Sequence, residues 1–266
     1  MKRVTLCIPP IAAALILVAV GCFSNSAGVH NERGLLYLEQ GALEKAIEEF
    51  DKAIEIDQAM AETYNNRGIT YKFLGLYQQA IQDFDKAIEI DPSTAEAFNN
   101  RGLTFDDIGQ FERAIQDFGK AIEIAPMMHE AFNNRGYDYT FKLEEFRLAI
   151  DDFDQAILLD SDNSAAYTNR GFAYGNLGEY QQAIENYNKA IELDPSSSFT
   201  YELKGVARIN LGQFREALED LDQAIILNPE RGSPYYNRSI VNSETGRYAQ
   251  ARADNDKACS LDGQFC

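Results

Sequence analysis

Basic residues recur at a fixed place along the sequence, and most are followed by an acidic or amide residue sixteen positions later. The basic residues are Arg33, Arg67, Arg101, Arg135, Arg170, Lys204 and Arg238. Their counterparts are Glu49, Asp83, Asp117, Asn186, Asp220 and Asp254, with Asp152 following Arg135 after one extra residue. A planar guanidinium binds a carboxylate through two parallel hydrogen bonds. The spacing therefore predicts structural ion pairs, among them Arg67–Asp83, Arg101–Asp117 and Arg135–Asp152.

Asparagines stand directly before many of these basic residues. They are Asn65, Asn66, Asn99, Asn100, Asn133, Asn134, Asn169 and Asn237. An amide carries both a donor and an acceptor, so a row of amides can bind an extended peptide backbone without demanding a particular sequence. The alternative is that each asparagine bonds to neighbouring backbone of its own chain. The sequence leaves both interpretations open.

Residues with the spacing of a catalytic or metal-binding site do not occur. His30 and His129 have no cysteine partner at metal-ligand spacing, and the sequence contains no phosphate-binding glycine loop, nucleophile elbow or zinc-protease helix. The carboxylates recur too regularly to indicate a catalytic pair. We therefore expect a protein that is not an enzyme and holds neither a cofactor nor a metal.

The four cysteines fall into two groups at the two ends of the chain. Cys7 and Cys22 belong to the first segment, whereas Cys259 and Cys266 lie close to the C-terminus. In an oxidising compartment the last two could form a disulfide that fastens the C-terminus. Two free thiols are the alternative, because the distance between the two Cα atoms does not follow from the sequence.

Paired helices are the elements that must position these residues. Apolar residues have helical spacing from Tyr64 to Leu74 and again from Ala80 to Ile88. Between these runs, Gly75 can adopt the left-handed conformation that ends a helix. The pattern returns every 34 residues, as measured between Gly68, Gly102 and Gly136. Such a period predicts an array of two-helix units that must stack to cover their apolar faces.

The order of residue types inside each unit resembles the tetratricopeptide repeat. Its marks appear as Tyr64, Gly68, Tyr71, Tyr77, Ala80, Phe84, Ala87 and Pro92. The resemblance covers nearly all of the chain after about residue 27, and it implies an all-α solenoid, a right-handed superhelix of about seven repeats. The repeats run near 27–60, 61–94, 95–128, 129–163, 164–197, 198–231 and 232–265. The fourth has one extra residue in the turn at 142–145, and the divergent seventh is predicted to be a terminal cap.

The first 28 residues differ from the repeats. Lys2 and Arg3 precede an apolar run at 11–20, which is typical of a secretory signal. The segment resembles a bacterial lipoprotein signal, in which Cys22 is lipid-modified, and an uncleaved membrane anchor is the alternative. We predict a signal peptide at 1–21, a lipid-attachment cysteine and tether at 22–28, and a repeat domain at 29–266. The resemblance implies the bacterial cell envelope, lipid-anchored at the outer membrane and facing the periplasm; a secreted or periplasmic protein is the alternative.

The net charge of the chain limits the classes of partner that it is expected to bind. There are 24 Lys and Arg against 42 Asp and Glu, a net charge of −18. Nucleic-acid binding needs a basic footprint, so we exclude it, and we expect contact with a membrane only through lipid on Cys22. For much of the acidic excess, such as Asp83, Asp85 and Glu89, a solvated face without a partner is the alternative interpretation.

The family resemblance also implies a mode of binding. In tetratricopeptide arrays the first helices of successive repeats line a concave groove, and the asparagines are expected near it. The lysine and asparagine of chaperone-binding arrays are replaced here by Asn65 and Ile69, so an acidic partner is not expected. The resemblance implies a protein–protein interaction scaffold that binds a protein or an extended, non-acidic peptide during envelope complex assembly. The alternative is a structural protein that associates with copies of itself.

Overall fold

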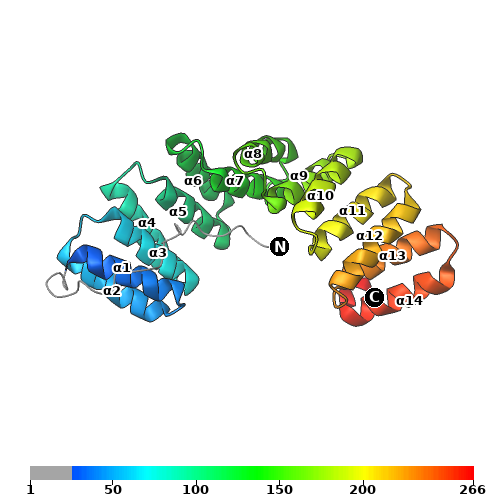
Figure 1. The fold of residues 1–266 in the computed structure, drawn as a ribbon, viewed down its shortest axis with the longest axis horizontal. Coiled ribbons are helices and arrows are strands. Elements are labelled where there is room, and N and C mark those ends of the chain that lie inside the picture. Colours follow the sequence, from blue (N-terminus) through cyan, green and yellow to red (C-terminus); the bar gives the residue numbers. More distant parts are fainter. Residues whose placement is uncertain (1–25) are drawn as a thin grey trace. The chain divides into compact units, whose positions relative to one another are not determined.

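The computed structural model describes residues 26–266. Fourteen α-helices follow one another in this part of the chain as seven consecutive pairs, and the same residues contain no β-strand (Figure 1). The prediction of an all-α repeat solenoid is therefore confirmed. The predictions that fall on residues 1–25, including the lipid-attachment site at Cys22, lie outside the described residues.

The helices belong to two compact units, described here by residues 26–138 and 139–266. The first unit holds α1 (Ala27–Glu39), α2 (Leu43–Ile56), α3 (Ala61–Phe73), α4 (Tyr77–Ile90), α5 (Ala95–Asp107), α6 (Phe111–Ile124) and most of α7 (His129–Phe141). The second holds the end of α7, α8 (Phe146–Leu159), α9 (Ser164–Asn176), α10 (Tyr180–Leu193), α11 (Ser198–Asn210), α12 (Phe214–Leu227), α13 (Gly232–Glu244), α14 (Tyr248–Leu261) and the 3-10 helix η1 (Gly263–Phe265). None of the helices within residues 26–266 is both long and apolar enough to cross a membrane.

The repeat domain starts slightly earlier than the sequence predicts. Helix α1 begins at Ala27, so the last two residues of the predicted tether, Ala27 and Gly28, are helical. The side chain of Ser26 accepts a hydrogen bond from the backbone N–H of Val29 at 3.4 Å and caps the helix. A serine at this position satisfies one of the N–H groups that lack a partner in the first turn of a helix.

A glycine with positive φ follows the first helix of six of the seven pairs. Gly75 has φ of 74° in the turn between α3 and α4, and five further glycines take the same place. In the fourth repeat the glycine is missing, and Glu144 adopts φ of 57° instead. The turn at 142–145 is predicted to hold the extra residue. In this turn a residue other than glycine adopts the left-handed backbone conformation.

The two helices of a pair approach closely because a glycine faces an aromatic ring. A Cβ atom added to Gly102 of α5 would lie 2.7 Å from the ring of Phe118 in α6 and 3.1 Å from the carbonyl oxygen of Ala114. Phe118 is itself buried. A side chain at Gly102 would therefore push the helices apart, as the recurrence of a small residue at this position predicts.

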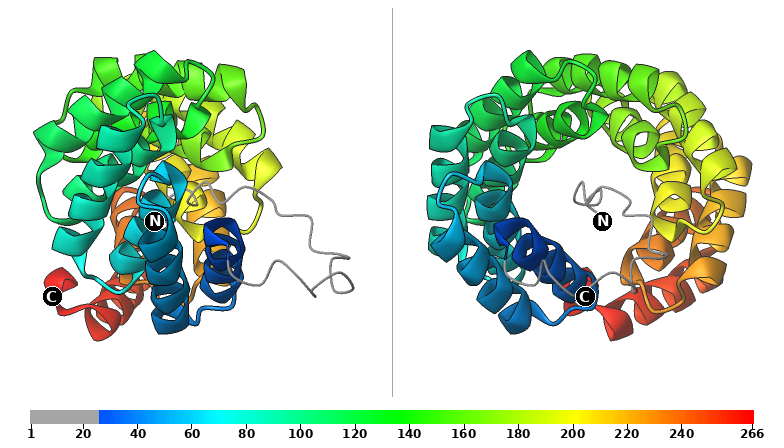
Figure 2. Two further views of the ribbon diagram at one scale, coloured as in Figure 1. Left: turned by 90° about the vertical axis from the view of Figure 1, so that its left-hand side faces the viewer. Right: turned by 60° about the vertical axis from the view of Figure 1, so that its left-hand side comes forward.

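Between successive pairs, the even-numbered helix of one pair packs on the odd-numbered helix of the next, and odd-numbered helices also contact one another. Within the first unit α1 contacts α3 and α3 contacts α5, whereas α2, α4 and α6 do not contact each other. Within the second unit α9, α11 and α13 make the same successive contacts, while α8, α10, α12 and α14 do not. Odd and even helices thus form two rows in each unit (Figure 2). We call the surface of the odd row the odd-helix face.

The C-terminus folds back onto the last helix pair. Cys259 of α14 and Cys266 form a disulfide, with Cα atoms 4.8 Å apart, as one of the two alternatives predicted. The ring of Phe265 in η1 stacks on Tyr236 of α13 with ring centroids 5.1 Å apart. The tail therefore covers part of the final pair.

Candidate functional site

The arginine that precedes each glycine joins the two helices of its repeat. Arg67 of α3 donates from Nε and Nη2 to the two oxygens of Asp83 in α4, each at 2.7 Å. Arg101 bonds to Asp117 in the same way at the same distances. These bidentate contacts are the pairs that the spacing predicts. The third predicted pair, Arg135 with Asp152, joins residues of the two units and stays a prediction.

Each of these arginines also reaches the preceding repeat, which the sequence prediction missed. Nη1 of Arg67 donates to Asp51 of α2 at 2.5 Å, and Nη1 of Arg101 donates to Asp85 of α4 at 2.5 Å. Asp83 and Asp85 therefore pair with the arginines of two different repeats, and the alternative of a solvated face without a partner is wrong for these two residues. The second carboxylate, two residues after the first and repeating with it, was the available signal.

Aromatic rings enclose the guanidinium groups. The guanidinium carbon of Arg67 lies 5.6 Å from the ring centroid of Tyr64 and 5.8 Å from that of Tyr71. Burial alone lowers the pKa of Arg101, but its bonds to Asp117 and Asp85 outweigh this effect and raise it. Three of the five N–H donors of each arginine are therefore bonded to carboxylates of the chain itself, and aromatic rings stack near the guanidinium. The arginine ladder is structural.

Departures from the repeat pattern are compensated locally. In the fifth repeat Arg170 donates from Nε to the amide oxygen of Asn186 at 2.7 Å. In the sixth repeat Lys204 replaces arginine, and Arg208 occupies the position of an aromatic residue. Both cations contact Asp220, at 3.0 and 2.6 Å. The repeat pattern does not predict this role for Arg208, because it places an aromatic residue there.

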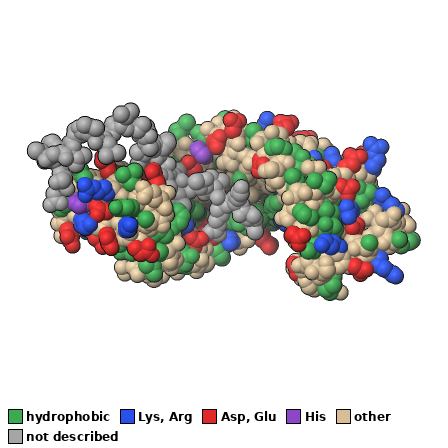
Figure 3. All heavy atoms as spheres, turned by 60° about the horizontal axis from the view of Figure 1, so that its bottom comes forward, with side chains coloured by type: hydrophobic (Ala, Val, Ile, Leu, Met, Phe, Trp, Pro, Cys, Tyr) green, Lys and Arg blue, Asp and Glu red, His purple; other side chains and the backbone are tan. Residues whose placement is uncertain are grey.

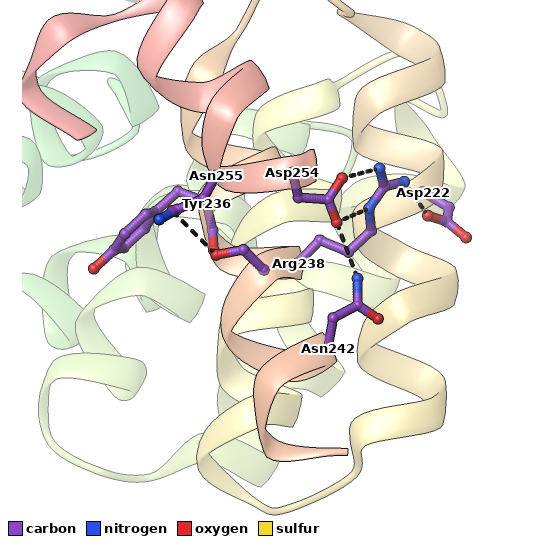
Figure 4. Close-up of polar contacts among 7 residues, drawn as sticks. Asp222, Tyr236, Arg238, Asn242, Asp254 and Asn255 are labelled. Carbon is purple, nitrogen blue, oxygen red and sulfur yellow. Dashed lines mark hydrogen bonds and ion pairs between the residues drawn. The ribbon is translucent and has the colours of Figure 1, made fainter. Parts of the chain in front are cut away.

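The seventh repeat keeps the ion pair while replacing its surroundings (Figure 4). Arg238 bonds to Asp254 of its own repeat and to Asp222 of the preceding one. Asn242, where other repeats have an aromatic residue, donates to Asp254 at 2.9 Å. Nearby, Ser239 takes the place of the packing glycine and lies 3.4 Å from Asn255, which replaces the bulky ring. Serine is larger than the glycine of other repeats and asparagine is smaller than the ring, so the two changes compensate each other in volume. Both residues are polar, as expected for a terminal repeat that is in contact with solvent.

In the first repeat, His30 stands where other repeats have an aromatic residue. The carboxylate of this repeat, Glu49, has different partners as a result. Nδ1 of His30 lies 2.7 Å from Oε2 of Glu49, and Nζ of Lys52 donates to Oε1 at 2.5 Å. Burial raises the pKa of Glu49, but the hydrogen bonds from Lys52 and His30 prevail and lower it. Glu49, predicted to face Arg33, is therefore held by these two other residues.

The predicted asparagine row is a ladder of hydrogen bonds between successive odd helices. The amide nitrogen of Asn100 in α5 donates to the side-chain oxygen of Asn65 in α3 at 3.1 Å. The same contact joins neighbouring repeats at Asn66–Asn31, Asn134–Asn99 and Asn237–Glu202, over 3.1 to 3.2 Å. The acceptors Asn31 and Glu202 were not singled out from the sequence. Their common separation of 35 residues, one more than the period, could have identified them.

Burial limits what these amides can contact. Asn65, Asn66, Asn99, Asn100, Asn133 and Asn134 are all buried, whereas Asn169 and Asn237 are partly exposed. In the sixth repeat Leu203 cannot donate, and a hydrogen bond between Thr168 and Thr200, 3.1 Å long, joins α9 to α11 instead. The ladder thus bonds one repeat to the next through side chains rather than backbone. A peptide-binding role for its amides stays a prediction.

An apolar position on the odd-helix face differs in exposure along the chain. In the first three repeats it is filled by Leu35, Ile69 and Leu103, which are all buried. In the fourth repeat it is filled by Tyr137, which is partly exposed. In the second unit it is filled by Phe172 of α9, Val206 of α11 and Ile240 of α13, and all three are partly exposed. We call these last three residues the apolar row. At one end of the row, the ring of Phe172 stacks on Phe141 with ring centroids 4.8 Å apart.

The arrangement of charged side chains within residues 26–266 bears on metal and nucleic-acid binding. Within residues 26–266 no three His, Cys, Asp or Glu side chains are grouped so that they could hold a metal ion. Acidic and basic side chains are interspersed on the face drawn in Figure 3 rather than gathered into a basic patch. A basic patch of that kind is the footprint that nucleic-acid binding requires.

Comparison with protein-family models identifies the repeats individually. A model described as "Tetratricopeptide repeat" matches residues 61–94, 95–128 and 164–197, and these ranges coincide with three predicted repeats. A second, described as "TPR repeat", matches 34–75. Two further tetratricopeptide repeat models match 186–219 and 203–264. A comparison with curated protein sequences finds no match.

Solved structures of similar fold include proteins above one quarter sequence identity. A structure of MamA protein is 28% identical over 64% of this chain and 92% of its own, with a TM-score of 0.59. YrrB, described as a TPR protein with an unusual peptide-binding site, is 26% identical over 70% of this chain and 95% of its own, with a TM-score of 0.61. A tetratricopeptide repeat protein from Parabacteroides merdae shares the fold at 20% identity, covering 89% and 93%, with a TM-score of 0.66.

The helix pairs, the glycine–aromatic contacts and the 34-residue period therefore agree with the family matches. Together the matched segments run from residue 34 to 128 and from 164 to 264, and the chain belongs to the tetratricopeptide repeat proteins.

Proposed function

We propose that the protein is a non-enzymatic scaffold that binds a partner polypeptide on the odd-helix face of its second unit. The observation that carries this proposal is the partial exposure of the apolar row, whose equivalents in the first three repeats, Leu35, Ile69 and Leu103, are buried. Apolar side chains that stay exposed in register on neighbouring helices form a surface that a partner can cover. Hydrogen bonds between Thr168 and Thr200 and between Asn237 and Glu202 join α9 to α11 and α11 to α13 and hold these helices in register.

The spacing of the apolar row suits an extended peptide. Packed helices lie about 8–10 Å apart. A polyproline II segment rises about 3.1 Å per residue with three residues per turn, so side chains on one side repeat about every 9 Å. A peptide with an apolar residue at every third position would therefore meet Phe172, Val206 and Ile240 in turn.

Charge and similarity support a peptide partner of a particular kind. The net charge of −18 disfavours an acidic peptide and favours a neutral or basic one. YrrB, one of the similar structures, is described as having a peptide-binding site. We extend peptide binding to this chain because of the apolar row, and the similarity to YrrB alone would not carry it.

The location we propose rests on the N-terminal sequence. Lys2 and Arg3, the apolar run at 11–20 and Cys22 after Gly21 support export and lipid attachment in a bacterial cell envelope. A scaffold anchored there would contribute to the assembly of envelope complexes. Metabolic labelling with a lipid precursor, comparing the wild type with Cys22→Ser, tests this part of the proposal independently.

Binding is tested with labelled peptides of two spacings. One carries leucine at every third position and the other at every fourth, in an otherwise identical neutral or basic sequence. We expect the first to bind more tightly in fluorescence anisotropy, and Val206→Asp to weaken it at least about tenfold, because a charge in an apolar contact is desolvated without a partner. Ile226→Asp is the matched control, because Ile226 is 71% exposed on α12, away from the apolar row. Equal effects of the two variants, or none, would contradict the proposal.

Self-association is a second candidate that a separate observation favours. Leu158 of α8 and Ile226 of α12 are 76% and 71% exposed, and both lie on even-numbered helices of the second unit. Large apolar side chains in contact with solvent mark surfaces that can associate. Light scattering across protein concentration distinguishes this role, since a mass that rises with concentration and falls in Leu158→Asp would support it.

A further inference from the structure

A small pocket opens in the second unit beside the apolar row. Its walls come from the end of α9, the start and middle of α10, and α11, and its volume is about 210 Å³. The pocket is lined with apolar groups of Phe172, Tyr180, Leu203 and Val206. Tyr187 also lines it; this residue is the most deeply buried of the lining and carries a hydroxyl at its tip. Two members of the lining, Phe172 and Val206, belong to the apolar row.

Tyr187 departs from the pattern of the repeat and lines this pocket. The equivalent residue is phenylalanine in four other repeats, namely Phe50, Phe84, Phe118 and Phe153. Tyr187 is only 2% exposed, and its ring packs against Gly171 as the phenylalanines pack against their glycines. The added hydroxyl lies 3.8 Å from where a Cβ atom of Gly175 would be. The next repeat carries isoleucine, Ile209, in place of Gly175.

The hydroxyl of Tyr187 makes no hydrogen bond within residues 26–266, and it is not among the fully enclosed polar atoms of these residues, so it is open to the pocket. Water in the pocket can bond to this hydroxyl, and a ligand that displaces the water without replacing its hydrogen bond loses affinity. Burial also raises the pKa of Tyr187, so the group stays neutral and keeps its proton to donate. A ligand that enters the pocket therefore gains by offering this hydroxyl a polar atom.

The size of the pocket limits the ligand to one side chain. Pockets that hold drug-sized molecules have volumes of about 300–1,000 Å³. The 210 Å³ pocket is smaller and has an apolar wall with a single polar group on its floor. Tyrosine has this distribution, an apolar ring with a hydroxyl at its tip that both donates and accepts.

Two asparagines at the edge of the pocket can hold the backbone of the same ligand. The amide nitrogens of Asn176 and Asn210 donate to carbonyl oxygens of their own helices, Phe172 and Val206, at 2.9 Å each. Both residues are exposed and both line the pocket. Their side-chain oxygens accept no hydrogen bond from the described part of the chain, so each can accept one from a peptide N–H.

We propose that this pocket binds a tyrosine side chain of the partner peptide, with the hydroxyl of Tyr187 bonded to the hydroxyl of the bound tyrosine. The peptide context rests on the proposed function above. The pocket itself does not, because its geometry and the unpaired hydroxyl exist whatever occupies the apolar row.

The pocket is tested with two small probes and the full chain. p-Cresol is the side chain of tyrosine, and toluene is that of phenylalanine. In NMR titrations we expect both to shift the amide signals of Gly175 and Val206, with p-cresol bound about three- to tenfold more tightly. In Tyr187→Phe the preference should disappear while toluene binding is kept. This variant restores the residue of four other repeats, so it is expected to fold.

A second variant tests the location. Gly175→Ile places the residue of the next repeat at the pocket wall and should abolish binding of both probes. Equal affinity of p-cresol and toluene for the wild type, or a preference for p-cresol that survives in Tyr187→Phe, would overturn the proposal.

A peptide titration separates this proposal from the proposed function. A peptide with apolar residues at every third position, one of them tyrosine, is compared with its phenylalanine counterpart. Binding of both peptides without preference would leave the scaffold function standing and overturn the tyrosine pocket. Selective binding of p-cresol at Gly175 without any peptide binding would support the pocket and contradict the proposed function.

Discussion

Arg101 donates two parallel hydrogen bonds to Asp117 of its own repeat, and a third to Asp85 of the preceding repeat. One guanidinium thus fastens the two helices of a pair and also fastens that pair to its neighbour. Because each repeat touches only its neighbours, such a contact stabilises both the repeat and the interface on which the array depends.

The contact between Arg101 and Asp117 is expected to be energetically coupled. The Asp117 side chain is 8% exposed, and removing one member of a buried pair leaves the other charge without compensation. We expect Arg101→Ala and Asp117→Ala each to lower the free energy of unfolding by about 3 kcal/mol. The double variant should lose less than the sum, with a coupling of about 1–3 kcal/mol.

Asp85 provides the control for this cycle. Its side chain is 53% exposed, so solvent screens its contact with Arg101. Asp85→Ala should cost no more than about 1 kcal/mol. Urea unfolding followed by circular dichroism measures all of these variants, and zero coupling between Arg101 and Asp117 would show that the bidentate contact adds nothing.

The asparagine ladder should contribute to the interface between repeats. Asn100→Ala removes the donor to Asn65 and leaves a buried oxygen unpaired, which costs about 1–3 kcal/mol. Asn176→Ala is the control, because Asn176 is exposed and its amide nitrogen bonds only within α9. The control should change stability by less than about 0.5 kcal/mol. Equal losses in the two variants, measured by urea unfolding, would exclude a specific role for the ladder.

The sequence predicts the fold well because the residues that pack the two helices of a pair are the same residues that recur with the 34-residue period. A small residue faces a ring in most repeats, as at Gly68, Gly102 and Gly171, and it returns every 34 residues except for the one extra residue of the fourth repeat. It also predicts the partner of Arg67 within the repeat, since both residues lie on helices whose register the period fixes. The left-handed turn at Glu144 follows from the same count, because one extra residue must be accommodated there.

Contacts between repeats are harder to predict, because they depend on how each pair is placed against the next. The second carboxylate of each arginine and the acceptor of each ladder asparagine belong to a neighbouring repeat. The exposure of the apolar row is harder still. Leu103 and Val206 occupy the same position of their repeats, yet only Leu103 is buried. The side chains around them decide the difference, and no local pattern in the sequence records it.

Two glycines one turn apart in α9 should respond oppositely to the same substitution. A Cβ atom at Gly171 would lie 2.7 Å from the ring of Tyr187, whereas one at Gly175 has no neighbour nearer than 3.8 Å. Gly171→Ala should therefore destabilise the protein by about 1–3 kcal/mol through overpacking. Gly175→Ala should be neutral or stabilise it by up to about 1 kcal/mol, since alanine favours the helix. Thermal unfolding of the two variants checks this, and destabilisation by Gly175→Ala would show that the space beside it is filled.

The disulfide should hold the last helix pair together. Cys259 and Cys266 close a loop of only a few residues, for which the loss of chain entropy is worth about 2 kcal/mol. Replacing both by serine should increase hydrogen exchange in α13 and α14, because Phe265 is then free to leave Tyr236. Reductant should have the same effect on the wild type and none on the serine variant. Unchanged exchange on reduction would mean that the ring contact alone suffices.

Acid should weaken the first repeat through Glu49. The pKa of this carboxyl is lowered from its ordinary value of 4.5, although burial opposes the shift, because Lys52 and His30 bond to its charged form. A carboxyl whose pKa is lower in the folded state stabilises the fold above the unfolded value, and the contribution is lost as the pH falls through the folded value. Glu49→Gln should therefore increase hydrogen exchange of α1 and α2 at pH 6. The difference from the wild type should shrink steadily once the pH falls below about 4.5. Glu48→Gln, at the exposed neighbouring position, should show no comparable difference at any pH. A Glu49→Gln effect that stays constant from pH 6 to pH 3 would show that shape rather than charge makes this glutamate stabilising.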